Sequence, residues 1–187
     1  PIETNYRPEL DVSPALGPLE ANYNQSQIGV LGWIVELGRM DITTEVSMLS
    51  SHNGLPRVGH LQVIFRIFSY LKTKTNARLV LDPTYADIDY ASFPQENWNE
   101  FYGDAKEHVP TNAPPPRGKP VKIRCYVDAD HAGDKLTRQS RTGVVIFLNG
   151  APIYWYSKKQ NTVETSTFGS EFVALKIATE TLRSLRY

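Results

Sequence analysis

The spacing of the apolar residues changes partway along the chain, and this change constrains the fold more than any other feature. Between residues 24 and 72 the apolar residues recur at helical spacing. From Val121 to Asp128 they alternate with polar residues, as in a strand with one buried face. The stretch 112–120 between these parts holds four prolines and favours neither helix nor sheet. The sequence therefore predicts a helical part, an extended connector and a sheet.

Three helices are predicted in the first part. The first two are separated by the break Gly38-Arg39-Met40-Asp41, and the third follows Pro56. Their apolar stripes are Ile28, Leu31, Ile34, Val35 and Leu37, then Ile42, Val46 and Leu49, then Leu61, Ile64, Phe65, Phe68 and Leu71. Residues 1–20 hold several prolines and are expected to lack regular structure, whereas 78–81 is a candidate short strand.

The second part reads as strand, hairpin and helix. A buried run, 144–148, leads into Asn149-Gly150, a strong signal for a tight hairpin turn, and then into a strand over 153–156. A final helix would be capped by Ser166 or Thr167. Its expected apolar stripe is Phe172, Leu175, Ala178, Leu182 and Leu185. We therefore expect an α/β (α+β) fold in which helices precede a three-stranded antiparallel start of a mixed sheet plus one helix.

Charge and cysteine content restrict the partners. The net charge is zero, but residues 1–120 carry 10 Lys and Arg against 14 Asp and Glu, whereas 121–187 carry 10 against 6. The second part is thus the candidate for a polyanionic partner. A lone cysteine, Cys125, can form neither an internal disulfide nor a multi-cysteine zinc site, which favours an intracellular protein. No apolar run or signal peptide points to a membrane.

Three carboxylates are candidates for chemistry. Asp128 and Asp130 close the first predicted strand and share one face of it, so they repel each other unless a divalent cation lies between them. The alternative is a strand that runs into an ordinary polar turn. Glu171 lies one turn inside the final helix, beside its apolar stripe, where a carboxylate needs a partner. The alternative for Glu171 is an exposed first-turn residue that complements the helix dipole.

Several motifs carry a resemblance to a known family. The segments Tyr126-Val-Asp-Ala-Asp-His-Ala-Gly133, Ser140-Arg-Thr-Gly143, Trp155-Tyr-Ser-Lys-Lys-Gln160 and Ser166-Thr-Phe-Gly-Ser-Glu-Phe172 follow in the order of the ribonuclease H domain of copia-type retrotransposons. The earlier segments 26–33, 41–50 and 70–72, together with His60, resemble the connection between the polymerase palm and ribonuclease H. His131 and Gly169 depart from the usual residues of that family. The Tyr-x-Asp-Asp motif of the polymerase is absent, so polymerisation is not assigned to this chain.

The resemblance implies an arrangement and an activity. It implies a connection-like helical segment over 1–90, a proline-rich linker over 91–120 and a ribonuclease H-like domain, truncated at its C-terminus, over 121–187. The family hydrolyses the RNA strand of RNA/DNA hybrids with two Mg²⁺ ions. Asp128 and Glu171 map onto catalytic carboxylates that bind magnesium, and Asp130 is a further candidate ligand.

The resemblance also implies what this stretch lacks. The family uses further acidic residues beyond position 187, so we expect the fragment to bind Mg²⁺ weakly and not to cleave hybrids. Its ribonuclease H fold also has a fourth and a fifth strand that pair along the first strand, so we expect the fragment without them to be poorly stable. The implied partners are an RNA/DNA hybrid and the remainder of a polyprotein, in cytoplasmic particles.

Basic residues of the second part are candidate contacts for nucleic acid. They are Arg138, Arg141, Lys158 and Lys159. The alternative is that they are simply solvated. Two other functions stay open: a transposon remnant that only binds nucleic acid, and an unrelated structural domain in which the acidic residues cap turns.

Overall fold

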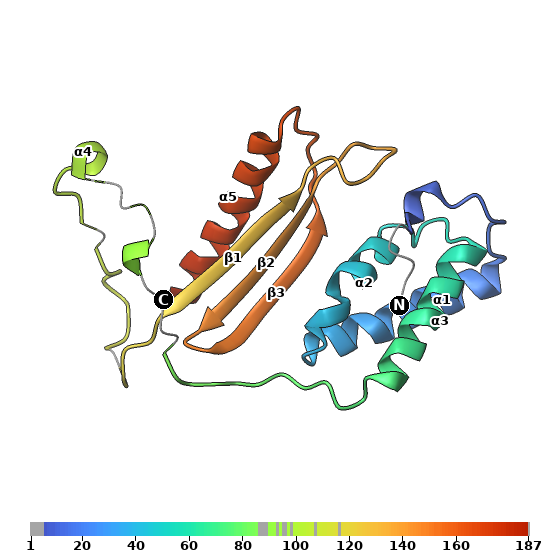
Figure 1. Cartoon of the computed structure of the whole chain (residues 1–187), viewed down its shortest axis with the longest axis horizontal. Coiled ribbons are helices and arrows are strands. Elements are labelled where there is room, and N and C mark those ends of the chain that lie inside the picture. Colours follow the sequence, from blue (N-terminus) through green and yellow to red (C-terminus); the bar gives the residue numbers. More distant parts are fainter. Residues whose placement is uncertain are drawn as a thin grey trace.

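The computed structural model describes residues 6–85, 90–92, 94, 97, 99–106, 108–115 and 117–186. A group of helices lies beside a three-stranded sheet, and a long connection passes from one to the other (Figure 1). The main elements are α1 (Pro18–Glu36), α2 (Thr43–Ser50), α3 (Val58–Thr73), α4 (Asn99–Tyr102), β1 (Ile123–Asp130), β2 (Arg141–Leu148), β3 (Ala151–Lys159) and α5 (Thr167–Arg186), with short 3-10 turns η1 (Pro8–Leu10), η2 (Met40–Ile42) and η3 (Tyr90–Ser92).

Helices α1, α2 and α3 share one apolar core, which confirms the three predicted helices. Leu31 and Ile64 are fully buried in this core, and Leu49 is nearly so. Helix α1 begins at Pro18, within the segment expected to lack regular structure. Proline suits the first helical position because the amide it lacks has no partner there, and Glu20 Oε2 accepts from the Gly17 N–H at 3.2 Å.

The sheet is antiparallel throughout, in the order β1-β2-β3, as the hairpin signal predicted. Val127 pairs with Val144 and Cys125 with Ile146, so these residues face the same side of the sheet. On that side Val144 and Ile146 pack against Ala178 of α5. The β2–β3 turn is made by Asn149, whose φ is +54°, and Gly150.

Helix α5 buries only part of the predicted stripe: Ala178 is in the core and Leu182 packs against it, but Phe172, Leu175 and Leu185 do not. Ser170, Ala174 and Ala178 are the residues that face the sheet, and they are at most 1% exposed. Phe172 and Leu175 are 60% and 52% exposed, and Leu185 is exposed as well. Small side chains allow the helix to lie close to the sheet, so the larger residues occupy its outer side. The predicted cap is confirmed, because Ser166 Oγ accepts from the Gly169 N–H at 3.2 Å.

The connection between α3 and β1 contains no strand in its described residues. The prediction of a strand at 78–81 is wrong, because this segment pairs with no other strand and Val80 and Leu81 are 68% and 65% exposed. A β-forming composition without a partner for its backbone does not make a strand. Among the described helices none has the length and apolar content needed to cross a membrane.

The helical group docks on the sheet face opposite α5. The Trp155 indole N–H donates to the Val35 carbonyl of α1 at 3.1 Å, and Ser47 Oγ of α2 donates to the Ser157 carbonyl at 2.5 Å. Arg141 reaches the same hydroxyl, since its Nη1 lies 2.6 Å from Ser47 Oγ. The sheet is therefore covered by α5 on one side and, near β3, by α1 and α2 on the other.

Candidate functional site

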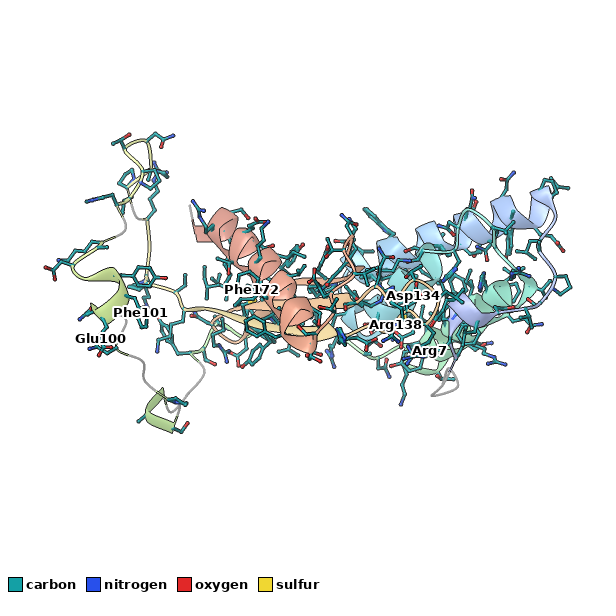
Figure 2. The ribbon with its side chains drawn as sticks, turned by 90° about the horizontal axis from the view of Figure 1, so that it is seen from above. Arg7, Glu100, Phe101, Asp134, Arg138 and Phe172 are labelled. Atoms are coloured by element: carbon teal, nitrogen blue, oxygen red, sulfur yellow. The ribbon has the colours of Figure 1, made fainter. Side chains whose placement is uncertain are left out.

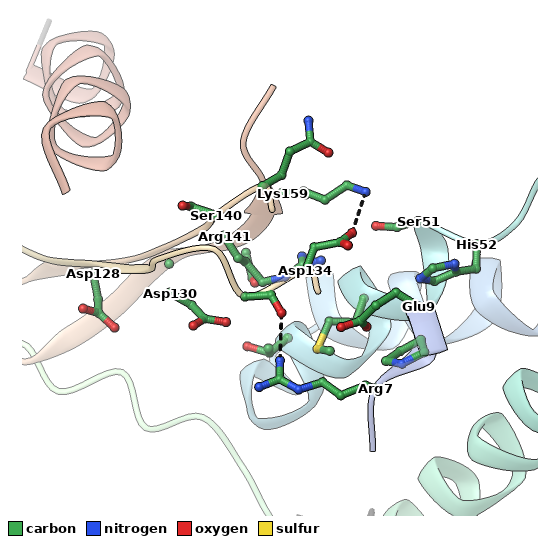
Figure 3. Close-up of a pocket in the computed structure, with 17 residues that line it drawn as sticks. Arg7, Glu9, Ser51, His52, Asp128, Asp130, Asp134, Ser140, Arg141 and Lys159 are labelled. Atoms are coloured by element: carbon green, nitrogen blue, oxygen red, sulfur yellow. Dashed lines mark hydrogen bonds and ion pairs between the residues drawn. The ribbon is translucent and has the colours of Figure 1, made fainter. Parts of the chain in front are cut away.

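Strand β1 carries two carboxylates at its end, on the face that α5 does not cover. Asp128 pairs with Gly143 and Asp130 with Arg141. Because side chains alternate along a strand and Val127 belongs to the core under α5, Asp128 and Asp130 both point to the other face. Figure 3 shows them pointing away from α5, and both are exposed. The sequence prediction that these carboxylates share a face is confirmed.

The two carboxylates line a cavity of about 210 Å³ at the junction of the sheet with the helical group. Three parts of the chain build it: the turn η1, helix α2 and the sheet end with its 131–139 loop. Arg7, Asp134 and Arg138 gather at this junction, whereas Glu100 and Phe101 lie at the opposite end of the molecule (Figure 2). The charged or titratable residues that line the cavity are Arg7, Glu9, His52, Asp128, Asp130, Asp134, Arg141 and Lys159.

Arg141 is the half-buried cation of the cavity. Burial lowers the pKa of its guanidinium, and the nearby Asp130, Asp134 and Glu9 oppose that shift. In the part of the chain that the structure describes, Ser47 is its one hydrogen-bond partner. The remaining donors of the guanidinium fork are therefore available to an oxyanion in the cavity.

The other cations of the cavity tie its walls together. Lys159 Nζ lies 3.2 Å from Asp134 Oδ2, and Arg7 Nη1 donates to the Gly133 carbonyl at 3.1 Å (Figure 3). Burial alone would raise the pKa of Asp134, but hydrogen bonds from Thr137 and Lys159 outweigh it and hold the pKa below its usual value. Asp134 is thus a fixed anion that orients Lys159, while Asp128 and Asp130 stay exposed.

Glu171 lies apart from this cavity. It is half-buried near the start of α5, on the helix that covers the opposite face, and it is not among the residues that line the cavity. The structure therefore does not bring Asp128, Asp130 and Glu171 into one cluster. Within the described ranges no group of three or more His, Cys, Asp or Glu residues could hold a metal ion. The described residues alone do not form a complete magnesium site.

The four basic residues predicted to contact nucleic acid are divided between two faces. Arg141 and Lys159 line the cavity, and Arg138 is exposed in the adjoining loop with φ +59°. Lys158 pairs with Thr142, so its side chain faces the α5 side instead. Among the buried side-chain atoms of the described loop 131–139, His131 Nδ1 is the one without a hydrogen-bond partner.

Sequence reasoning missed four charged or titratable residues of the cavity: Arg7, Glu9, His52 and Asp134. Arg7 and Glu9 lie more than a hundred positions before the strand they meet, in a segment without a motif. Their contacts exist only because the helical group docks on the sheet. Local sequence patterns could not have indicated these residues, because their place in the cavity depends on how the helical group docks on the sheet.

Comparisons with known proteins give several partial likenesses. The chain is 28% identical over 155 residues to the Secreted RxLR effector protein 161 of Plasmopara viticola, covering 83% of this chain and 85% of that protein. It is 28% identical over 146 residues to the retrovirus-related Pol polyprotein from transposon RE1 of Arabidopsis thaliana, covering 77% of this chain and 8% of the polyprotein. Over 59 residues it is 44% identical to the Pol polyprotein from transposon TNT 1-94 of Nicotiana tabacum, covering 32% of this chain and 4% of the polyprotein.

No family model and no solved structure matches the chain. The likeness to Pol polyproteins recurs in several transposons and supports a transposon-derived protein.

Proposed function

We propose that this chain is the part of a retrotransposon Pol polyprotein that joins reverse transcriptase to ribonuclease H and builds the first half of the nuclease domain. The observation that carries the proposal is the pair Asp128 and Asp130 on an outer strand, beside a cavity that also presents Arg141 and Lys159. Carboxylates and cations side by side suit a phosphodiester that approaches together with a divalent cation. Because the chain spans only 8% of the RE1 polyprotein, the activity of a whole polyprotein is part of the proposal.

The proposed nuclease site lies at the edge of the sheet rather than on one of its faces. Asp128 points to one face and α5 covers the other, but β1 is an outer strand and α5 packs mainly on it. Glu171, near the start of α5, can therefore meet Asp128 only around the open edge of β1. Further ligands from elsewhere in the polyprotein would then approach along that edge. In this proposal Asp128 and Glu171 are the magnesium ligands and Asp130 assists.

The substrate in this proposal is an RNA/DNA hybrid. Such a hybrid offers a phosphate backbone to Arg141, Lys159 and Arg138, while its 2′-hydroxyls distinguish the RNA strand. Lys158, on the other face, is not part of this surface. The magnesium, when bound, would activate water and stabilise the charge on the phosphate.

Cleavage of a labelled hybrid tests the proposal. The chain would be extended at its C-terminus by the residues that follow in its source reading frame, and single-turnover cleavage would be measured with Mg²⁺. Asp128→Asn and Glu171→Gln should each lower the rate at least about a hundredfold, because each removes a metal ligand. Asp104→Asn, an equal charge change at an exposed position in the connection, is the matched control and should leave the rate unchanged. Undiminished cleavage by Asp128→Asn would exclude this function.

Nucleic-acid binding without cleavage is the second candidate, favoured by the free donors of Arg141 beside Arg138 and Lys159. Fluorescence anisotropy of a hybrid at rising salt measures it on the chain alone. Affinity should fall steeply with salt, and Arg138→Gln should weaken it more than Lys158→Gln. Equal effects of the two variants would exclude the cavity as the binding surface.

A further inference from the structure

Buried polar residues gather where α5 begins against the sheet. Four polar side chains of this region are at most 3% exposed: Ser140, Thr142, Gln160 and Ser170. They come from the loop before β2, from β2 itself, from the position after β3 and from the first turn of α5. Figure 1 shows that α5 begins at the same end of the sheet at which β1 ends. Polar groups that are taken out of water need hydrogen-bond partners, so these residues should be bonded to one another.

Gln160 is the centre of this group. Its side-chain Nε2 donates to Thr142 Oγ1 at 3.1 Å and to the Ser170 carbonyl at 2.9 Å. A backbone carbonyl can only accept, so Ser170 requires the amino group of the amide, and not its oxygen, on this side. The backbone N–H of Gln160 donates to the Ser140 carbonyl at 2.8 Å. One residue therefore joins α5 to β2 and to the loop before β2.

Thr142 connects this amide to the strand that carries the aspartates. It pairs across the sheet with Ala129 of β1, which lies between Asp128 and Asp130. Ala129 and Thr142 are both buried. Close-packed interiors transmit displacements because they leave little free space. A shift of Gln160 against Thr142 is therefore also a shift against the part of β1 that carries both carboxylates.

Ser170 connects the same amide to the helix that carries Glu171. Its carbonyl accepts from Gln160, and its own hydroxyl donates to the Thr167 carbonyl at 2.8 Å. Ser170 is fully buried, and Glu171 follows it directly in α5. Holding Ser170 in place fixes the rotation of α5 about its axis and its position along the sheet. These two quantities decide where the carboxylate of Glu171 lies.

Ser140 extends the network to the turn after Asp130. Its hydroxyl accepts from the Ala132 N–H at 3.0 Å. Ala132 has a φ of +49°, a left-handed conformation that alanine rarely adopts, so this bond supports a strained turn. Because the Ser140 carbonyl also accepts from Gln160, one connected set of hydrogen bonds holds both the turn after Asp130 and the start of α5.

We propose that Gln160 is a positioning residue of the nuclease site: it holds the start of α5 against the end of β1 and thereby sets the separation of Glu171 from Asp128. The role of these two carboxylates rests on the proposed function, whereas the geometry that Gln160 imposes does not. Gln160 does not line the cavity beside Asp128, so it acts through Thr142 and Ser170 and not on a substrate.

The distance between two spin labels tests this geometry without metal or nucleic acid. In the full chain with Cys125→Ser, the variants Asp128→Cys and Glu171→Cys carry the labels, and electron spin resonance measures the distribution of distances between them. Gln160→Met keeps the length of the side chain but removes both of its hydrogen bonds, so it should broaden this distribution at least about twofold. Gln62→Met, the same change at an exposed position of α3, is the matched control and should leave the distribution unchanged.

Circular dichroism of the labelled variants reports whether each is folded. An unchanged distribution in folded Gln160→Met, or an equal broadening by Gln62→Met, overturns the proposal.

A milder pair of variants at Thr142 covers the case in which Gln160→Met does not fold. Thr142→Ser keeps the hydroxyl that accepts from Gln160 and should leave the label distances as they are. Thr142→Val has the same shape without an acceptor, so it should broaden the distribution, but less than Gln160→Met because the bond to Ser170 remains. Equal distributions in the Ser and Val variants would count against the proposal.

The magnesium requirement of cleavage connects this geometry to the proposed function. In the chain extended at its C-terminus, Gln160→Met should raise the Mg²⁺ concentration for half-maximal cleavage at least about fivefold, because misplaced ligands bind a metal more weakly. Its affinity for the hybrid without Mg²⁺ should change less than about twofold, since Gln160 lies outside the cavity. Broadened label distances with an unchanged Mg²⁺ requirement would overturn the proposal.

The two kinds of measurement separate this proposal from the function on which it rests. If Asp128→Asn cleaves as fast as the wild type, the proposed function fails, and with it the nuclease role of Gln160. The label distances would still show whether Gln160 holds α5 against β1. If Asp128→Asn is inactive but Gln160→Met changes neither the label distances nor the Mg²⁺ requirement, the function stands and this proposal alone fails.

Discussion

His52 is a single side chain whose titration depends on the docking of two parts of the chain. Burial lowers its pKa below the usual value of 6.5, and the nearby His60 and Lys159 lower it further. The unfolded chain thus binds this proton more readily than the folded chain. The contribution of neutral His52 to stability is complete above pH 6.5 and is lost as the pH falls from there through the folded pKa. Urea unfolding at pH 7.5 and 5.0 measures this loss.

A variant separates His52 from the other histidines. His52→Gln should reduce the drop in unfolding free energy between the two pH values, because the group that takes up a proton on unfolding is gone. His108→Gln, at an exposed position in the connection, should leave the drop as in the wild type. An unchanged drop in His52→Gln would show that its burial does not control the acid response.

Asp41 holds the end of α3 to the turn after α1. Its carboxylate accepts from Arg39 at 2.8 and 2.9 Å and from the Tyr70 hydroxyl at 2.9 Å. The hydrogen bond from Arg39, foremost, keeps the pKa of Asp41 below its usual value despite partial burial. Asp41→Asn should lower the unfolding free energy by about 0.5–1 kcal/mol, the range of a well-formed exposed ion pair. Urea denaturation at neutral pH measures it, with the exposed Glu36→Gln as a control that should change little.

At the scale of elements, the response of α5 to mutation should follow the observed burial of its residues and not the size of their apolar side chains. Ala178 is 1% exposed against β2, whereas Phe172 is 60% exposed. Ala178→Leu should destabilise the chain by about 1–3 kcal/mol because the helix cannot lie close to the sheet with a larger residue there. Phe172→Ala should change the unfolding free energy by less than about 0.5 kcal/mol. Thermal or urea unfolding compares the two variants, and the reverse ranking would contradict the observed face.

The elements that the sequence could predict are those whose local signals agree with their packing. The three first helices and the hairpin at Asn149-Gly150 follow from periodicity and turn chemistry. The α5 face was predicted only in part: Ala178 and Leu182 belong to it, whereas Ser170 and Ala174 were missed because hydrophobic size suggests burial of larger residues while close helix–sheet packing selects small ones. The shared face of Asp128 and Asp130 follows from strand alternation alone. Their cavity does not, because Arg7 reaches it only through long-range docking.

At the scale of the whole molecule, the Ser47 hydroxyl is one of the contacts that connect the helical group to the sheet. Ser47 Oγ donates to the Ser157 carbonyl and lies 2.6 Å from Arg141 Nη1, so its removal leaves two polar groups without this partner. Ser47→Ala should therefore lower the unfolding free energy by about 1–3 kcal/mol. Ser50→Ala is the matched control on the same helix, because the Ser50 hydroxyl bonds only within α2, to the Ser47 carbonyl at 2.8 Å.

Amide hydrogen exchange tests whether the lower unfolding free energy of Ser47→Ala comes from weaker docking of the helical group on the sheet. In Ser47→Ala, exchange should accelerate in α2 and β3, the two elements that the hydroxyl joins, while β1 and α5 keep their protection because their core lies on the other face. The Trp155 indole N–H, which donates to Val35, should exchange faster for the same reason. Uniform acceleration across all elements would mean that the helices and the sheet unfold as one unit. An equal effect of Ser50→Ala would mean that the Ser47 contact does not control the docking. The cavity that Asp128 and Arg141 line exists only while the two parts are docked. In a chain that has lost this contact, Arg138→Gln should therefore no longer weaken the binding of a nucleic acid more than Lys158→Gln does.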